Sequence, residues 1–270
     1  MGKPNLAVGV DRASGYWLAV VYENEEYDRV AVEEDFEKLW EEFDPERDRI
    51  LVDVPIGLFD ENDDESEERG RECDTLARKV LGSRSSSVFT APARQAAKLA
   101  EEEKEHGEVS DTNHEIVKKG LSIQAYHISP GIAEVDAFLC PDSEDEKRRR
   151  RDLVKEAHPE VCFAAFNGGA LEYSKTSAVG FGERLSALEN IVDEPGETFR
   201  KIGRDLADYE DDVDVGAIDP DDVLDAMALA VVAGADTDDL HPLPEEPERD
   251  VRGLPMQMVY RAETPFEFDE

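Results

Sequence analysis

The chain has 270 residues, of which 67 are Asp or Glu and 30 are Lys or Arg, so its net charge is −37. Because 40% of the residues are hydrophobic and the acids are spread along the chain, the composition favours a folded protein over a disordered one. Three scattered cysteines exclude a disulfide framework, and no apolar run approaches the roughly 18 residues that span a membrane.

This excess of acid is typical of a halophile, in which a large net charge keeps proteins soluble. Near 1 M salt the Debye length is about 3 Å, so the negative surface repels a nucleic acid only at contact range. The charge therefore does not exclude a nucleic-acid partner. No signal peptide precedes the first apolar run, and we expect a cytoplasmic protein with no membrane partner.

The first 55 residues have the pattern of a β-rich segment. Apolar runs predict strands over 6–10, 17–22, 27–32 and 50–54, and the apolar spacing over 35–43 predicts an amphipathic helix. Short turns join the first three runs, which predicts an antiparallel meander. The run over 50–54 predicts a buried strand that returns to the centre of the sheet.

The next segment, residues of about 67–150, has helical patterns and no strand signal. We therefore expect a helical insertion within a single domain of residues 1–270. Its one basic block, Lys147 to Arg151, follows several acids, which predicts internal charge pairs on a solvated helix. A fifth strand is predicted over 153–157, helices over 158–166, 181–192, 197–208 and 220–233, and a candidate edge strand over 256–261.

Three aspartates lie among apolar residues. Asp11 ends the first apolar run, although it equally suits an Asx-type turn. Asp53 interrupts the fourth strand, and Asp225 lies beyond the first turn of a helix that is apolar all round. A buried carboxylate must be neutralised, hydrogen-bonded or bound to a cation. If the fold brings the three together, they form an oxygen-ligand site for Mg²⁺ or Mn²⁺.

Two further acids are candidates for the same site. Asp222 lies three residues before Asp225 and shares its helical face, although an acid in the first turn also complements the helix dipole. A fourth acid comes from Glu156 or Glu160, which lie at the end of the fifth strand and the start of the next helix. Glu160 is the preferred one, and the choice stays open.

The local charge changes sign between residues 71 and 98, where six bases accompany two acids. Arginines and the hydroxyls of this stretch suit contacts to phosphate. The alternative is a helix that forms salt bridges with the acidic remainder of the chain. The candidate phosphate ligands, including two bases further along the chain, are Arg71, Arg78, Arg84, Arg94, Lys175 and Arg184.

Several short motifs follow one another along the chain in a specific order. They include Gly9-Val10-Asp11, Asp53-Val54-Pro55-Ile56-Gly57-Leu58, Arg71-Glu72-Cys73-Asp74, Glu156-Ala157-His158-Pro159-Glu160 and Asp222-Val223-Leu224-Asp225-Ala226. The ordered set, over residues of about 6–235, closely resembles the domain-of-unknown-function 429 family of predicted RNase H-like nucleases. Arg12, a cation directly after the first acid, departs from what we expect at that position.

The resemblance implies a ribonuclease H-like α/β fold in β-β-β-α-β-α order, with a mixed five-stranded sheet and helices on both faces. It also implies that acids from the first strand, the fourth strand and a late helix bind two divalent metals, as in relatives such as the Holliday-junction resolvases. Asp11, Asp53 and Asp225, with Asp222 or Glu160, would then bind two Mg²⁺ or Mn²⁺ ions about 4 Å apart and hydrolyse phosphodiester bonds. The substrate would be DNA, RNA or another phosphoester.

Two other functions compete with a nuclease. One is a catalytically silent module that binds nucleic acid or protein and keeps the acids for metal-dependent structure. The other is a phosphotransferase of the actin and sugar-kinase type, which needs glycine-rich phosphate turns after two paired strands. The chain offers one such turn weakly, over residues 11–15.

Overall fold

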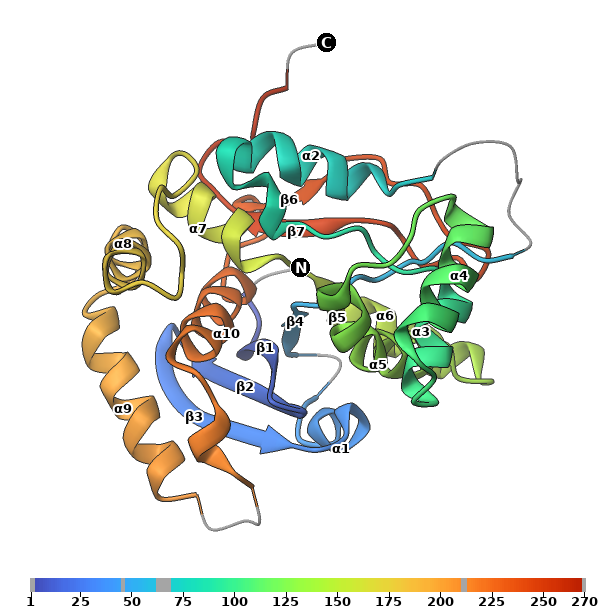
Figure 1. Ribbon diagram of the computed structural model, residues 1–270. Helices are drawn as coiled ribbons and strands as arrows, with labels where there is room; N and C mark the ends of the chain where they lie inside the picture. The colour runs from blue at the N-terminus through green and yellow to red at the C-terminus, as the bar shows by residue number, and fades with distance from the viewer. Residues whose placement is uncertain (1–2, 45–46, 62–68, 210–212, 269–270) are drawn as a thin grey trace.

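The computed structural model describes residues 3–44, 47–61, 69–209 and 213–268. Within these ranges the fold is mixed α/β, with ten α-helices around a mixed sheet of seven strands in the order β3-β2-β1-β4-β5-β7-β6 (Figure 1). None of the described helices combines the length and the apolar character that crossing a bilayer requires.

The first three strands form the antiparallel meander that the sequence predicts. β1, β4, β5 and β7 then run parallel to one another, and β6 pairs antiparallel with β7 at the sheet edge. The strands are β1 (Leu6–Ala13), β2 (Tyr16–Glu23), β3 (Glu26–Glu33), β4 (Arg49–Val52), β5 (Val154–Glu156), β6 (Leu240–Leu243) and β7 (Met258–Arg261).

The predicted number of five strands is wrong, because two short strands near the C-terminus extend the sheet. The tail segment predicted as an edge strand forms β7, which is an inner strand between β5 and β6. β6 has only four residues, and Pro242 lacks the N–H of a strand donor, so no strand pattern marks it in the sequence. Such a proline is tolerated at a sheet edge.

Five of the helices, α2 to α6, lie between β4 and β5, which confirms the helical character predicted for about 67–150; residues 67 and 68 lie outside the described residues. The helices are α1 (Phe36–Trp40), α2 (Glu72–Leu81), α3 (Arg94–Glu101), α4 (His106–Val117), α5 (Ile123–Phe138), α6 (Glu144–Leu153), α7 (Pro159–Asn167), α8 (Ala178–Glu189), α9 (Pro195–Ala207) and α10 (Pro220–Ala233), with short 3₁₀ turns η1 (Gly82–Ser87) and η2 (Val215–Ala217). The basic block lies in α6, where Lys147 and Arg148 each pair with an acid three residues earlier, as predicted.

Alternate side chains of the strands enter two separate cores. Ala7, Leu18 and Leu51 pack toward α7–α10, whereas Val10 and Val52 pack toward α1, α3 and α5. Figure 1 shows the corresponding layers, with α8, α9 and α10 on one side of the sheet and α3–α6 on the other. The sheet therefore has one helical layer on each face.

α10 lies directly on the strands at the centre of the sheet. Its residues from Val223 to Ala233 are all buried. It crosses β1 at Gly9, where a Cβ atom would lie 2.0 Å from the Ala226 carbonyl oxygen and 2.2 Å from the Ala230 nitrogen. Only a residue without a side chain lets the helix backbone approach the strand so closely. This contact sets where the first turns of α10 stand relative to the end of β1.

The close crossing predicts that Gly9→Ala strongly destabilises the fold. The added methyl group must push α10 away from β1, and overpacking of this kind costs about 1–3 kcal/mol or more. Thermal unfolding in molar KCl would measure the loss. The matched control is Gly203→Ala on the exposed face of α9, where a Cβ meets no atom within 4 Å. We expect Gly203→Ala to raise the free energy of unfolding by up to about 1 kcal/mol. Equal melting temperatures for the two variants would contradict the close approach of α10 to β1.

Candidate functional site

Two of the predicted acids lie at the ends of neighbouring parallel strands. Val10 of β1 pairs with Val52 of β4, and the Asp53 N–H donates a 3.0 Å hydrogen bond to the Val10 carbonyl. Asp11 alternates with Val10 and shares the sheet face of Ala7, which packs toward α10. Asp53 is the first residue after β4 rather than a residue inside the strand, because the pairing ends at Val52.

Asp225 reaches the same place from α10. It precedes Ala226, whose carbonyl lies against Gly9, and Gly9 is two residues from Asp11 on the same face of β1. Asp225 is 2% exposed and Asp11 is 8% exposed. The close helix crossing thus carries a buried acid to the strand ends that hold Asp11 and Asp53.

Burial and repulsion by nearby carboxylates raise the pKa values of all three carboxyl groups. For Asp11 and Asp53 burial is the main cause and the neighbouring carboxylates add to it, so both pKa values lie well above the ordinary 3.8. Burial raises the pKa of Asp225 to about 6, although Lys175 opposes the increase. The cluster of Asp11, Asp53 and Asp225, called the aspartate cluster below, therefore favours a bound cation.

Lys175 is a cation that the chain itself places in the aspartate cluster. Its Nζ donates to Asp225 Oδ2 at 2.7 Å and lies 3.1 Å from Asp221 Oδ2. Burial lowers the pKa of Lys175, but the charge of Asp225 and the other acids outweighs burial and raises this pKa above its ordinary value. The ammonium is therefore charged, and it contacts carboxylates of the chain, whereas the sequence predicts that it contacts a substrate phosphate.

Asp222 and Glu160 lie beside the aspartate cluster, and each has a partner. Asp222 Oδ2 accepts a 3.0 Å hydrogen bond from the Asp219 N–H at the start of α10. Glu160, at the start of α7, accepts a 3.0 Å hydrogen bond from Arg184 Nε and a second bond from Arg184 Nη2. Its charge contributes to the raised pKa of Asp53. Each acid therefore already has one partner, and their predicted role as metal ligands stays a prediction.

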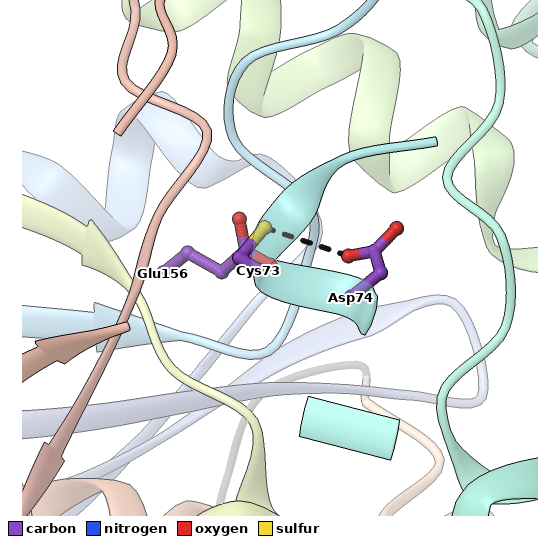
Figure 2. Close-up of side chains that lie close together, drawn as sticks. All are labelled: Cys73, Asp74 and Glu156. Carbon is purple, nitrogen blue, oxygen red and sulfur yellow. Dashed lines mark hydrogen bonds between the residues drawn. The ribbon is translucent and has the colours of Figure 1, made fainter. Parts of the chain in front are cut away.

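Glu156, the alternative fourth acid, belongs to a separate cluster (Figure 2). It pairs in register with Val52, whose side chain enters the core on the other side of the sheet. Its carboxylate accepts bonds of 2.6 and 2.8 Å from Arg71, and Arg71 Nη2 also lies 2.5 Å from Asp74 Oδ1. Glu156 adds to the raised pKa of Asp53, but its own cation is Arg71.

The cluster in Figure 2 has a spacing that could suit a metal, because ligand atoms of Cys73, Asp74 and Glu156 all lie within 4.8 Å of one another. The Arg71 guanidinium already supplies a buried positive charge at this place. Burial also raises the pKa of the Cys73 thiol, so the sulfur is protonated, whereas a metal binds the thiolate. We therefore place the candidate metal site at the aspartate cluster.

Three of the six bases predicted to bind phosphate are buried in ion pairs instead. Arg71, Arg94 and Arg184 are at most 1% exposed, so their guanidinium groups are closed to a ligand at the surface. Each satisfies carboxylates that would otherwise be buried without a counter-charge. The carboxylates bonded to Arg94 are those of Asp60, Asp136 and Asp250.

Arg78, in α2, and Arg84, in η1, are half-buried. Arg84 Nη2 lies 3.8 Å from Glu160 Oε2, and its buried Nε has no hydrogen-bond partner. Arg78 donates from Nε to the Val88 carbonyl at 3.1 Å. Arg84 is therefore the predicted phosphate ligand that combines nearness to the aspartate cluster with an unused donor.

The donor set of the aspartate cluster fits a divalent cation. The described residues include eight buried carboxylates, and six of them are bonded to an arginine; Asp11 and Asp225 are the two that are not. Asp225 Oδ1 is buried and has no hydrogen-bond partner. An orphaned buried oxygen costs free energy unless a ligand binds it. Carboxylate oxygens of this kind are the ligands that Mg²⁺ and Mn²⁺ prefer.

One contributor to the site escapes the sequence analysis. Asp221 would be expected only to complement the helix dipole, yet it contacts Lys175. The sequence does indicate that Asp221 lies near Asp225, because the two are four residues apart and lie on one face of α10. The position of Lys175 between them has no such signal, since it comes from a loop far away in the sequence.

The raised pKa of Asp11 predicts that Asp11→Asn stabilises the metal-free protein at neutral pH. An acid whose folded pKa is raised loses stability as the pH rises above the ordinary value of 3.8, and asparagine has no such charge. The amide keeps an acceptor for the Arg12 N–H, which lies 2.8 Å from Asp11 Oδ1. We expect a melting temperature about 3 °C higher or more at pH 7 in chelator.

The same measurement at pH 4 should show a smaller difference between Asp11→Asn and the parent chain. Asp238→Asn, on an exposed residue of the segment after α10, controls for the change in net charge and should leave the melting temperature unchanged. The prediction would be contradicted if Asp11→Asn melted at or below the temperature of the parent at pH 7. That result would mean that the ionised Asp11 carboxylate does not destabilise the fold.

No match was found among curated proteins or among solved structures. A family model described as a protein of unknown function (DUF429) matches residues 9–249. That range holds the whole aspartate cluster, Lys175 and Glu160. Because the match covers most of the chain, this protein belongs to the DUF429 family of proteins of unknown function.

Proposed function

We propose that this protein is a divalent-metal-dependent nuclease with a ribonuclease H-like fold. Support comes from the origin of the aspartate cluster: the end of the first strand, the end of the fourth strand and a late helix. This is the distribution that the family resemblance implies for metal-binding acids. The observation that carries the proposal is the orphaned Asp225 Oδ1, buried beside two further acids that no arginine neutralises.

Asp11, Asp53 and Asp225 would hold Mg²⁺ or Mn²⁺. When bound, such an ion supplies a Lewis acid for a phosphoryl oxygen and lowers the pKa of water. Arg84, whose side chain is 21% exposed, offers its guanidinium to a phosphate oxygen beside Glu160, and the hydroxyls of η1 offer further donors. Charge-assisted bonds of this kind position a phosphodiester without reading its sequence.

The substrate class is nucleic acid or another phosphoester. The surface charge of −37 opposes such a ligand at low salt but not near 1 M salt, where the Debye length is about 3 Å. The acid-rich composition supports a place in the cytoplasm of a halophile, where salt is that concentrated. Binding would then depend on short-range contacts such as those of Arg84 rather than on long-range attraction.

The proposal predicts that Asp53→Asn abolishes metal-dependent cleavage. The amide keeps the shape of the side chain but lacks the charge that binds the cation, and the loss should be about 100-fold or more. End-labelled single-stranded DNA, duplex DNA and RNA would be incubated with Mg²⁺ or Mn²⁺ in molar KCl, with chelator as a blank. Asp238→Asn is the control of equal charge change and should cleave like the parent.

Cleavage that persists unchanged in Asp53→Asn would contradict the nuclease proposal, as would the absence of cleavage from the parent chain with every substrate. Binding without cleavage would favour the silent module. Hydrolysis of ATP in place of nucleic acid would favour a phosphotransferase.

Arg84 supplies a separate prediction about substrate binding. Arg84→Gln removes the cation and the Nε–H donor, so KM should rise about 10-fold while kcat changes less, since one lost charge-assisted bond is about 1.5 kcal/mol. Steady-state cleavage kinetics in molar KCl would measure both constants. Arg200→Gln, on exposed α9, is the control and should leave KM unchanged. An unchanged KM in Arg84→Gln would remove Arg84 from the substrate site.

A further inference from the structure

The ammonium of Lys175 is held in place by the segment between α7 and α8. The Ser177 N–H and Oγ both bond to the Ser174 carbonyl, at 3.0 and 2.8 Å. A Cβ at Gly180 would lie 2.0 Å from that same carbonyl oxygen, so only glycine lets the segment pack against the first turn of α8. Lys175 therefore projects from a backbone with little freedom to withdraw.

Arg184 ties the same segment to the acid beside the cluster. Its Nη1 lies 3.3 Å from the Tyr173 carbonyl oxygen, and its Nε bonds to Glu160. Glu183 accepts a further 2.9 Å bond from the Tyr173 N–H. The buried guanidinium thus fixes the start of the Lys175 segment against α7, and this is what Arg184 does in place of binding a phosphate.

Lys175 binds one of the two oxygens of Asp225 and leaves the other without a partner. Oδ2 bonds to the ammonium at 2.7 Å, whereas Oδ1 is buried and has none. A carboxylate that gives one oxygen to each of two metal ions needs both oxygens, but here one is already taken by a cation of the chain. One oxygen of Asp225 is left for a single ion.

The charges in the aspartate cluster also favour a single divalent ion. With a metal bound, the three ionised aspartates of the cluster and one ammonium leave two negative charges, which one divalent ion neutralises. Asp221 also contacts the ammonium, but it is half-buried, so solvent screens its charge. A second divalent ion would leave excess positive charge in a buried place, where unpaired charge is costly. Glu160 does not change this balance, because Arg184 neutralises it. Asp222 accepts a bond from the Asp219 N–H and is half-buried, so its charge is screened in part by solvent.

We propose that Lys175 occupies the position of the second cation, so that the aspartate cluster binds one divalent ion together with the Lys175 ammonium. This inference rests on the proposed function, and it replaces the pair of ions that the family resemblance implies. The single ion would bind Asp225 Oδ1 and the carboxylates of Asp11 and Asp53.

Lys175 is also placed to touch a substrate. An ammonium has three N–H donors; one donates to Asp225, and the charge of Asp221 lies 3.1 Å away as an ion pair. The side chain is 36% exposed, whereas that of Asp225 is 3% exposed, so the third donor has a path to a ligand from solvent. A phosphodiester oxygen is a ligand that this donor can bind, and the ammonium would stabilise negative charge that the second metal ion stabilises in a two-metal site.

The experiment compares crystals of the parent chain and Lys175→Met, both soaked in Mn²⁺, by anomalous scattering. We expect one Mn²⁺ peak in the parent cluster, with Lys175 Nζ still bonded to Asp225 Oδ2, and two peaks in Lys175→Met. Lys175→Arg keeps the cation and should bind one. Lys147→Met makes the same change of charge in a surface ion pair of α6 and should also bind one.

Two Mn²⁺ ions in the parent cluster with Lys175 displaced would overturn the inference and leave the proposed function standing. One ion in both the parent and Lys175→Met would overturn it too, because the number would not depend on Lys175. No ion in either cluster would overturn the inference and the proposed metal site together. If Lys175→Met fails to fold, electron paramagnetic resonance of the parent decides: a coupled Mn²⁺ pair contradicts the inference, and an isolated ion lost in Asp225→Asn supports it.

Discussion

The close contact between α10 and β1 is the constraint on which the candidate site depends. Because Gly9 has no side chain, the helix backbone at Ala226 rests directly on the strand. The neighbouring Asp225 is thereby carried to the ends of β1 and β4. A wider crossing would move its carboxylate away from Asp11 and Asp53. The geometry that packs the core thus also assembles the acids.

The carboxylates in the interior fall into two groups, those paired with an arginine and those of the aspartate cluster. Most buried acids surround an arginine: Arg71 holds Asp74 and Glu156, and Arg94 holds three aspartates. Such groups are neutralised by the chain and have a structural explanation. Among the described residues, the cation that the aspartate cluster contacts is the Lys175 ammonium, and the carboxyl pKa values of the cluster are raised. An excess of buried negative charge that the fold maintains is a common mark of a functional site.

Lys175 and Arg184 connect these two patterns. Arg184 neutralises Glu160 and at the same time holds the Tyr173 carbonyl, so the segment that carries Lys175 is fixed by a structural ion pair. The lysine then enters the cluster from a loop, while the acids come from strands and a helix. Rigid elements supply the ligands, and a braced loop supplies the cation. Such preorganisation suits a site that must stabilise charge without rearranging.

The sequence by itself determined the elements that have strong periodicity or clear ends. α10 begins at Pro220 and ends at Ala233 as predicted, because Asp219 and Pro220 mark its start and an unbroken apolar run marks its length. Asp11, Asp53 and Asp225 could be singled out because a carboxylate in an apolar run is anomalous wherever the run folds. The resemblance to the DUF429 family rests on the same residues, and the family match confirms that membership.

Only the tertiary structure decided which charges neutralise one another. Arg71, Arg94 and Arg184 have the composition of a phosphate-binding surface, but burial pairs them with carboxylates from distant segments. β6 and the inner position of β7 also depend on strand pairing, since neither four-residue strand has a period of its own. Local sequence records propensity and polarity, whereas the partner of a buried charge depends on contacts between segments that the sequence leaves far apart.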